Sequence, residues 1–292
     1  MICNFENTTE ASDRTSTREM NRSLEESDSG VDPNFIQLIT KYNKQREFVS
    51  LAAHELKSPI LPILGTLELI EYEFEESGKK EITLKIEHFE RLVRNVKRLE
   101  RLASEILDVT KIDDQSLRLN KEYFNVKELV LDLVHDHNKQ LQKNNLSTKL
   151  LYEFKIDEEE EEIPTRQDDS SPDIFINADK IRVNQVLDNL LTNAIKFTEE
   201  GTVSISITFK KGKNQMDRII ARVRDTGTGI HPEILPRLFS KFVTRSNMGT
   251  GLGLFISKNI VEAHGGKIWG ENNADGQGAT FVISLPAKGT NQ

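Results

Sequence analysis

Apolar residues recur at alternating spacings of four and three along residues 49–74. That spacing is typical of a helix that packs in coiled-coil fashion. A second such series occupies residues 82–106, after the polar segment 75–80. Two long helices joined by a short loop form an antiparallel hairpin. Because each helix has one apolar stripe, two hairpins would bury their stripes best as a four-helix bundle, so the pattern predicts a homodimer through this hairpin.

Beyond residue 120 the pattern changes to mixed α/β. Longer amphipathic segments predict helices over residues 126–141, 179–197 and 252–263. Shorter apolar or alternating segments predict strands over residues 148–156, 174–177, 203–209, 219–223, 267–269 and 280–285. We interpret residues 157–173, which begin with six consecutive acidic residues, as a flexible acidic loop.

The composition of the first segment differs from that of the rest. Residues 1–33 are rich in Ser, Thr, Glu, Asp and Asn and contain few apolar residues, which predicts disorder. The predicted organisation is therefore a tail (1–33), a helical hairpin (34–115) and an α/β domain (120–288), with a hinge over residues 113–121.

Bulk properties narrow the class of protein. The 292 residues carry a net charge of -8, which argues against a nucleic-acid binder. A single cysteine, Cys3, excludes an intrachain disulfide and a cysteine-based metal cluster. No apolar stretch is long enough to span a membrane, and there is no secretory signal pattern, so we expect a soluble, cytoplasmic chain without a membrane span.

The first candidate for chemistry lies on the first helix. The heptad phase directs His54 and Glu55 outward and places Ser58 one turn after His54. A neutral imidazole is a competent nucleophile near neutral pH, and an adjacent carboxylate can accept its ring proton. Pro59 removes a helix hydrogen bond and should bend the helix there. Taken singly, His54 could equally be an ordinary surface histidine.

The surrounding residues favour the chemical interpretation. The segment 48–60 contains His-Glu-Leu-Lys-Ser-Pro and closely resembles the H-box of two-component sensor histidine kinases, whose core is His-Glu-Leu-Arg/Lys-Thr/Asn-Pro. The resemblance implies that His54 is the phosphorylated residue and that Glu55 is its general base. Ser58 replaces the usual Thr or Asn, which positions water for dephosphorylating a partner. Phosphatase activity is therefore left open.

Four further segments follow in order: 189–197, 225–230, 238–242 and 249–254. In the first, Asn193 offers a hard oxygen to a cation and Lys196 a positive charge to phosphates. In the second, Asp225 follows a predicted strand and can accept a hydrogen bond from an exocyclic amine such as that of adenine. Gly227 and Gly229 let the backbone approach a flat ring. Asp-Thr-Gly also occurs in aspartic proteases, but the mixed α/β setting does not suit that class.

The glycine-rich segment 249–254 opens a predicted helix, so backbone N–H groups and the helix dipole can meet phosphate oxygens. Such a string also resembles a dinucleotide fingerprint, but it does not follow the first strand of a βαβ unit. A P-loop sequence is absent. The segment 238–242 would by itself indicate core packing.

Together these segments resemble the N, F and two G boxes of the histidine-kinase catalytic domain. The resemblance covers residues 45–287 and implies an ATP-binding α/β sandwich of the type shared by histidine kinases, type II topoisomerases and heat-shock chaperones. It implies that Asn193 binds Mg²⁺ and that Asp225 binds adenine. Lys241 stands where Arg is frequent. The nucleotide-binding residues implied are Asn189, Asn193, Lys196, Asp225, Gly227, Gly229, Lys241, Gly249, Gly251, Leu252, Gly253 and Thr280.

The resemblance implies a histidine kinase that uses Mg·ATP to phosphorylate its own His54. The phosphoryl group would then pass to an aspartate on the receiver domain of a separate response regulator. Two other functions are weighed against it. One is a related ATPase that drives conformational change, for which an outward His-Glu pair has no use. The other is a non-catalytic scaffold, for which an eroded nucleotide site would be expected.

Overall fold

The computed structural model describes residues 32–77, 85–143, 147–157, 173–212, 216–244 and 250–287. The chain divides into two compact units, Met1–Ser58 and Pro59–Gln292. Three predicted features lie outside the described residues. They are the tail up to residue 31, the inter-helix loop at 78–84, and the acidic loop from residue 158 to residue 172.

Two long helices occupy the predicted hairpin segment, α2 (Pro33–Ser77) and α3 (Ile86–Asp113). Helix α2 contains Pro59 and Pro62, and the Thr66 hydroxyl donates a hydrogen bond to the Pro62 carbonyl oxygen at 2.7 Å. The boundary between the two compact units falls next to Pro59, inside this helix. The bend at Pro59 stays a prediction.

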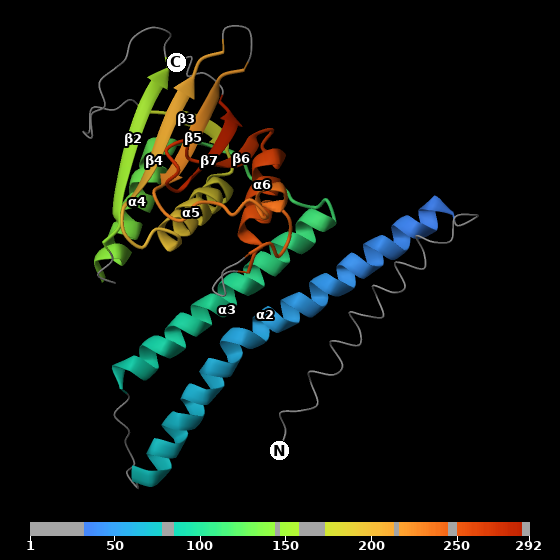
Figure 1. Cartoon of the computed structure of the whole chain (residues 1–292), viewed down its shortest axis with the longest axis vertical. Coiled ribbons are helices and arrows are strands. Elements are labelled where there is room, and N and C mark those ends of the chain that lie inside the picture. The colour runs from blue at the N-terminus through green and yellow to red at the C-terminus, as the bar shows by residue number, and fades with distance from the viewer. Residues whose placement is uncertain are drawn as a thin grey trace. The chain divides into compact units, whose positions relative to one another are not determined.

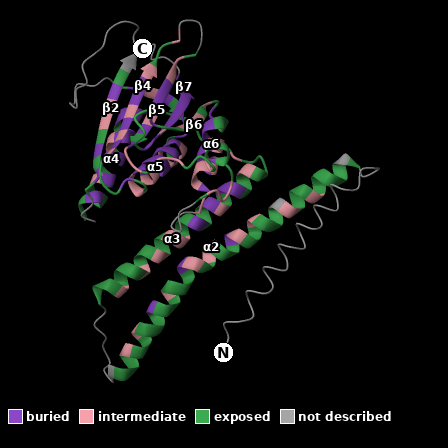
Figure 2. Ribbon diagram, in the orientation of Figure 1, coloured by how far each residue is buried: buried purple, intermediate pink, exposed green. Residues whose placement is uncertain are grey.

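Many residues of both helices are exposed in the single chain (Figure 2), and several of these residues are apolar. The exposed apolar residues include Ile60, Leu61, Leu64, Leu67 and Phe74 of α2 and Phe89, Val93 and Val96 of α3. The buried residues of α3 lie in its second half and include the carboxylate of Asp108. Arg182 Nη1 and Gln185 Nε2 each donate a hydrogen bond to Asp108 Oδ2 at 2.8 Å. The second half of α3 is thus bound to the α/β part of the same compact unit.

The α/β part contains two sheets (Figure 1). The smaller sheet pairs β1 (Glu122–Asn125) antiparallel with β3 (Phe175–Ala178). The larger sheet has five strands in the order β2-β4-β5-β7-β6. Its strands are β2 (Lys149–Asp157), β4 (Thr202–Lys210), β5 (Arg218–Asp225), β6 (Lys267–Asn272) and β7 (Ala279–Pro286). Strands β2 and β4 run parallel, and every other neighbouring pair of this sheet is antiparallel.

Three helices cover one face of the larger sheet (Figure 1). They are α4 (Val126–Lys143), α5 (Lys180–Lys196) and α6 (Gly253–Ala263). Helix α4 packs on β2, α5 on β4 and β5, and α6 on β6 and β7. The expected two-layer α/β sandwich is confirmed, with the helical segment before it.

Local sequence explains these elements. In β4 the buried Val203, Ile205 and Ile207 alternate with half-buried polar residues, so one face of the strand points into the helical layer. Helix α5 begins after Asp179, whose Oδ1 accepts a hydrogen bond from the Arg182 amide at 3.0 Å, as expected of an N-cap. Helix α6 ends at His264, before a turn that starts at Gly265. A short 3-10 helix, η1 (Leu235–Arg237), precedes α6.

Among the residues described, no helix combines the length and apolar character that a membrane crossing requires.

Candidate functional site

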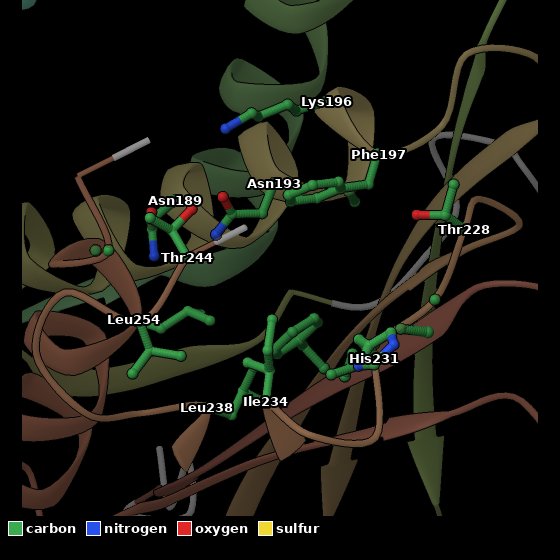
Figure 3. A pocket seen from close by; sticks show the side chains of 18 of the residues that line it. Asn189, Asn193, Lys196, Phe197, Thr228, His231, Ile234, Leu238, Thr244 and Leu254 are labelled. Atoms are coloured by element: carbon green, nitrogen blue, oxygen red, sulfur yellow. The ribbon is translucent and has the colours of Figure 1, made fainter. Parts of the chain in front are cut away.

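A cavity of about 470 Å³ lies among the predicted nucleotide-binding segments. Its walls come from the last turns of α5, the segment after β5, and the start of α6 (Figure 3). The volume is within the range of small-molecule sites, roughly 300–1,000 Å³. The predicted residues that line it are Asn189, Asn193, Lys196, Asp225, Gly229, Gly251 and Gly253.

Asp225 ends β5 and is only 4% exposed. Its Oδ1 accepts hydrogen bonds from the Gly227 amide at 2.9 Å and the Ala279 amide at 3.2 Å. Burial raises the pKa of this carboxyl, while the two backbone hydrogen bonds and the charge of Arg224 oppose the rise. Since both backbone bonds use Oδ1, Oδ2 is the atom available to accept from an exocyclic amine of a ligand.

The cavity next to Asp225 suits a flat apolar ring. Ile234 and Leu238 lie across the cavity from Asn193, and Phe281 adds a further apolar wall (Figure 3). Gly229 lines the same region with a φ of 72°, a backbone conformation that a residue with a Cβ rarely adopts. This end of the cavity therefore combines apolar walls with one buried acceptor.

The α5 wall is polar. Asn189, Asn193 and Lys196 are spaced to share one face of α5, and Figure 3 shows their side chains along the same side of the cavity. Asn189 Nδ2 donates to Ser257 Oγ of α6 at 3.0 Å. Burial lowers the pKa of the Lys196 ammonium, and the positive charges of Arg101 and Arg98 lower it further. Clustered cations and amide oxygens of this kind favour a phosphate group with its counter-cation.

The glycine-rich segment closes the cavity at the start of α6. Gly251 has a φ of 66°, and its carbonyl oxygen accepts from the Phe242 amide at 3.0 Å. A Cβ on Gly253 would overlap the side-chain amide of Asn189. Leu252 between them is 1% exposed and anchors the segment in the core, so it does not line the cavity. Gly249 lies outside the described residues.

Lys241 and Thr280 also lie away from the cavity lining. Lys241 Nζ binds both carboxylate oxygens of Asp113 at 2.7 and 2.6 Å and lies 5.1 Å from the centre of the Phe255 ring. Thr280 Oγ1 donates to Asn273 Oδ1 at 2.6 Å. The cavity lining includes neither residue, and a direct nucleotide contact by either stays a prediction. Gly227 acts on the site through its hydrogen bond to Asp225.

Asn273 was not among the residues predicted to form the site. Its Nδ2 donates to the Asp225 carbonyl oxygen at 2.8 Å and to the Gln277 carbonyl oxygen at 2.5 Å. Asn273 is 7% exposed and therefore fixes the backbone of Asp225 from behind the cavity. The only signal in the sequence was an Asn-Asn pair following a predicted strand, which ordinarily indicates a turn.

The predicted phosphoacceptor residues His54, Glu55 and Ser58 belong to the other compact unit, Met1–Ser58. His54 lies on α2 with its side chain 72% exposed. Predicted seam residues such as Leu67 are also exposed in the single chain, so the outward heptad position of His54 stays a prediction. Glu55 Oε1 lies 3.8 Å from His54 Nδ1, too far for a hydrogen bond, and the Glu55 side chain is 25% exposed. Ser58 is half-buried one turn later.

Comparison with known proteins connects both parts to one family. Residues 44–115 match the family "His Kinase A (phospho-acceptor) domain", and residues 178–289 match "Histidine kinase-, DNA gyrase B-, and HSP90-like ATPase". The sensor protein kinase WalK of Staphylococcus aureus (strain MRSA252) is 31% identical over 255 residues. The chain belongs to the two-component sensor histidine kinases. The WalK match covers 84% of this histidine kinase but only 37% of WalK itself, so the chain spans well under half of that relative.

Solved structures agree with the fold of this histidine kinase. Acinetobacter baumannii histidine kinase AdeS has a TM-score of 0.57 at 26% identity, covering 81% of this chain and 98% of that one. Histidine kinase ThkA, solved in complex with the response regulator protein TrrA, has a TM-score of 0.54 at 24% identity. That match covers 90% of this chain and 70% of ThkA, and it supports the fold alone.

The two family matches divide the site residues of this histidine kinase. The phospho-acceptor match contains His54 and Glu55, and the ATPase match contains the predicted nucleotide residues from Asn189 to Thr280. One residue of the cavity lining, Arg101, falls within the phospho-acceptor match instead. Sequence reasoning missed Arg101, because an arginine on a charged amphipathic helix has the same pattern as an ordinary solvated charge.

Proposed function

We propose that this chain is the kinase core of a two-component system, which transfers the γ-phosphoryl group of Mg·ATP to His54. The observation that carries the proposal is the pairing, in one chain, of an exposed His54 beside Glu55 with a cavity that has a buried carboxylate acceptor at Asp225 and a cationic wall on α5. A scaffold would not need the buried acceptor, and a plain ATPase would not need the histidine.

The chemistry at His54 follows from the arrangement of its two ring nitrogens. Glu55 lies on the Nδ1 side, so a proton on Nδ1 would be directed at the carboxylate and Nε2 would keep its lone pair. That lone pair forms the new N–P bond, while the bond from the γ-phosphorus to the bridging oxygen breaks and its electrons leave with ADP. The Nδ1 proton passes to Glu55. A change of about 1 Å in the 3.8 Å separation would make the hydrogen bond, and such contacts commonly tighten only when substrate binds.

The cavity residues bind and orient the nucleotide. Asp225 Oδ2 accepts from the adenine amine, and the apolar wall of Ile234 and Leu238 covers the ring. Asn189 and Lys196 bind phosphate oxygens. Asn193 offers an amide oxygen to Mg²⁺, an ion that proteins often hold through one or two side chains with substrate phosphates as its other ligands. The bound Mg²⁺ would neutralise phosphate charge during transfer.

The proposal extends to the dimer interface, the domains and the partner that receives the phosphoryl group. The hairpin over residues 34–115 forms a homodimer through the exposed apolar side chains of α2 and α3, and residues 120–288 form the catalytic domain. The phosphoryl group then passes from His54 to an aspartate of a response regulator. Histidine kinase ThkA, whose fold this chain shares, was solved in complex with the response regulator protein TrrA, a partner of the kind proposed here. Ser58 would position water if the chain also dephosphorylates that partner.

Incubation with γ-labelled ATP and Mg²⁺ tests the proposal. The label on the protein should be lost in acid and retained in alkali, as expected of a phosphorylated imidazole. His54→Gln should abolish labelling. His135→Gln is the matched control, because His135 is an exposed histidine on α4, and it should label as the unchanged chain does. ATP hydrolysis without any labelling would support the ATPase instead, and unchanged labelling of His54→Gln would overturn the site assignment.

Asn193→Ala provides the second test. Because Asn193 lies on the α5 wall, its loss should remove labelling together with Mg²⁺-dependent ATP binding. Full labelling of Asn193→Ala at limiting Mg²⁺ would contradict the metal assignment while leaving the His54 assignment intact.

A further inference from the structure

Arg101 lines the cavity although it comes from α3 and lies outside residues 178–289, which match the ATPase family. A second cavity of about 350 Å³ shares Arg101, Asn189 and Gly253 with the first. Arg101 therefore lies where the two cavities meet, beside the polar wall of α5. Its side chain is 52% exposed, so the guanidinium can change partners without first being freed from a packed core.

One buried carboxylate connects Arg101 to the glycine-rich segment. Arg101 Nε donates to Glu105 Oε1 at 3.0 Å, and Thr250 Oγ1 donates to Glu105 Oε2 at 2.7 Å. The Thr250 hydroxyl also accepts from the Leu252 amide at 3.1 Å. Glu105 is 6% exposed. A single acidic group on α3 thus holds both an arginine of the cavity and the segment that opens α6.

The charges around Arg101 favour an anion. Arg101 and Arg98 both act electrostatically on Lys196, whose pKa is lowered first by burial and then by these two positive charges. Placing several cations near one another costs free energy that a polyanion between them would relieve. Glu105 supplies one negative charge to this group, whereas a triphosphate would supply several.

We propose that Arg101 binds the phosphates of ATP and that it exchanges the Glu105 carboxylate for the nucleotide when it does so. The planar guanidinium fork suits phosphate oxygens as well as it suits a carboxylate. The inference rests on the proposed function, because it adds a residue from the phospho-acceptor segment to the nucleotide site.

The exchange has a mechanical consequence. When Arg101 leaves Glu105, the buried carboxylate loses that charge partner and, among the described residues, keeps its hydrogen bond from the hydroxyl of Thr250. The contact between α3 and the glycine-rich segment then depends on whether nucleotide is bound. By linkage, a change in α3 that stabilises the Arg101–Glu105 pair weakens ATP binding, and bound ATP weakens that pair by the same coupling free energy.

Calorimetric titration of ATP and adenosine, each into the full chain with Mg²⁺ present, tests the inference. Arg101→Gln should weaken ATP binding about ten-fold or more, the effect of losing one charge-assisted hydrogen bond. Adenosine affinity should not change, because adenosine has no phosphates. Arg94→Gln is the matched control: it removes the same charge from an exposed position on α3 that lies outside both cavities, and it should leave ATP affinity unchanged.

Glu105→Gln gives a prediction of opposite sign. With the competing carboxylate neutralised, Arg101 should bind phosphates more readily, and ATP affinity should rise by about three-fold. Adding Glu105→Gln to Arg101→Gln should raise ATP affinity less than Glu105→Gln does in the wild-type chain. This comparison separates an effect through Arg101 from simple charge repulsion by Glu105.

The outcomes separate the two proposals. A wild-type chain that binds ATP, together with an Arg101→Gln variant that binds it equally well, overturns the inference and leaves the proposed function standing. Equal losses of ATP and adenosine affinity in Arg101→Gln would assign Arg101 a purely structural role and also overturn the inference. A wild-type chain that binds no ATP overturns both.

Discussion

The Oδ1 atom of Asp225 accepts a hydrogen bond from the backbone amide of Ala279 at 3.2 Å, so the end of β5 is fixed to the start of β7. The same oxygen accepts from the Gly227 amide at 2.9 Å. Two backbone donors on one oxygen determine the orientation of the carboxylate. The other oxygen is therefore presented to the cavity in a fixed direction, which is the geometry required to distinguish a ligand donor from a ligand acceptor.

Asp225→Asn should change which base is preferred. The Asn Oδ1 can keep both backbone hydrogen bonds, but the group facing the cavity becomes the side-chain amide N–H₂, which is a donor. It would face the donor amine of adenine and leave both unpaired, which costs about 1–3 kcal/mol, or roughly ten- to hundred-fold in ATP affinity. Inosine triphosphate has an acceptor oxygen at that position, so its affinity relative to that of ATP should rise in Asp225→Asn. Competition binding measures the ratio; an unchanged ratio would show that Asp225 does not contact the base.

Gly253→Ala should impair nucleotide binding, because the added Cβ overlaps the Asn189 side-chain amide on the α5 wall. Overpacking of this kind costs about 1–3 kcal/mol, and here the displaced group belongs to the cavity. Gly65→Ala is the control, since apart from its chain neighbours and the backbone of its own helix no described atom lies within 4 Å of the position its Cβ would occupy. Titration with ATP should detect the loss in the first variant alone. Equal affinities in the two variants would argue against a role for Asn189 in phosphate binding.

The stability of the catalytic domain should depend on His264 at mildly acidic pH. His264 Nδ1 lies 2.8 Å from the Ile260 carbonyl oxygen, and Nε2 accepts from the Asp179 amide at 3.0 Å. Burial lowers the pKa of this histidine, so the folded state disfavours the proton. The unfolded chain binds the proton below about pH 6.5 and the folded chain only at lower pH. Stability is therefore full above that pH and falls as the pH drops towards the folded-state pKa.

Chemical denaturation at a series of pH values checks this prediction. The free energy of unfolding of the wild-type chain should decline below about pH 6.5 more steeply than that of His264→Gln. His135→Gln, which removes an exposed histidine, should follow the wild-type slope. Parallel slopes for wild type and His264→Gln would contradict the lowered pKa of His264.

Association through the hairpin should fail when a charge is placed on its apolar stripe. Leu67 of α2 is 47% exposed and Val96 of α3 is 51% exposed in the single chain, and both occupy predicted seam positions. Leu67→Asp and Val96→Asp should each weaken dimerisation about ten-fold or more, because an unpaired carboxylate would be buried at the interface. Leu151→Asp, at a 41% exposed position of β2, is the control. Sedimentation equilibrium measures the dissociation constants, and an unaffected dimer in both hairpin variants would exclude this interface.

Much of the fold could be predicted because the period of the apolar residues and the capping residues indicated the same element boundaries. The predicted helix over 179–197 and the observed α5 agree to within a residue at each end, since Asp179 is an N-cap and the apolar face has a helical period. Strand β1 was missed. It has four residues, and its partner β3 comes about fifty residues later, so neither length nor a hairpin turn indicated it. The parallel pairing of β2 with β4 is likewise a tertiary property that alternation does not encode.

The sequence predicted which residues belong to the cavity more reliably than it predicted which residues contact one another. Asn189, Asn193, Lys196 and Asp225 were predicted from their chemistry and spacing, and all four line the cavity. Lys241 pairs with Asp113 of α3, a residue 128 positions away, and no local pattern indicates such a pair. The segment 113–121, which was predicted to be a hinge, makes hydrogen bonds near both of its ends. Asp113 accepts from Lys241, and the Asn120 amide donates to Asp179 Oδ2 at 2.8 Å. Neither contact has a signature in the local sequence, because each joins segments that only the tertiary fold brings together.

The central claim is that His54 is the phosphoacceptor, and locating the phosphoryl group on the protein tests it most directly. After reaction with Mg·ATP and digestion at alkaline pH, tandem mass spectrometry should find a phosphorylated imidazole in the peptide that contains His54 and no modification of the peptide that contains His135. Phosphate on any other side chain, or ATP consumed with every histidine peptide unmodified, would contradict the account.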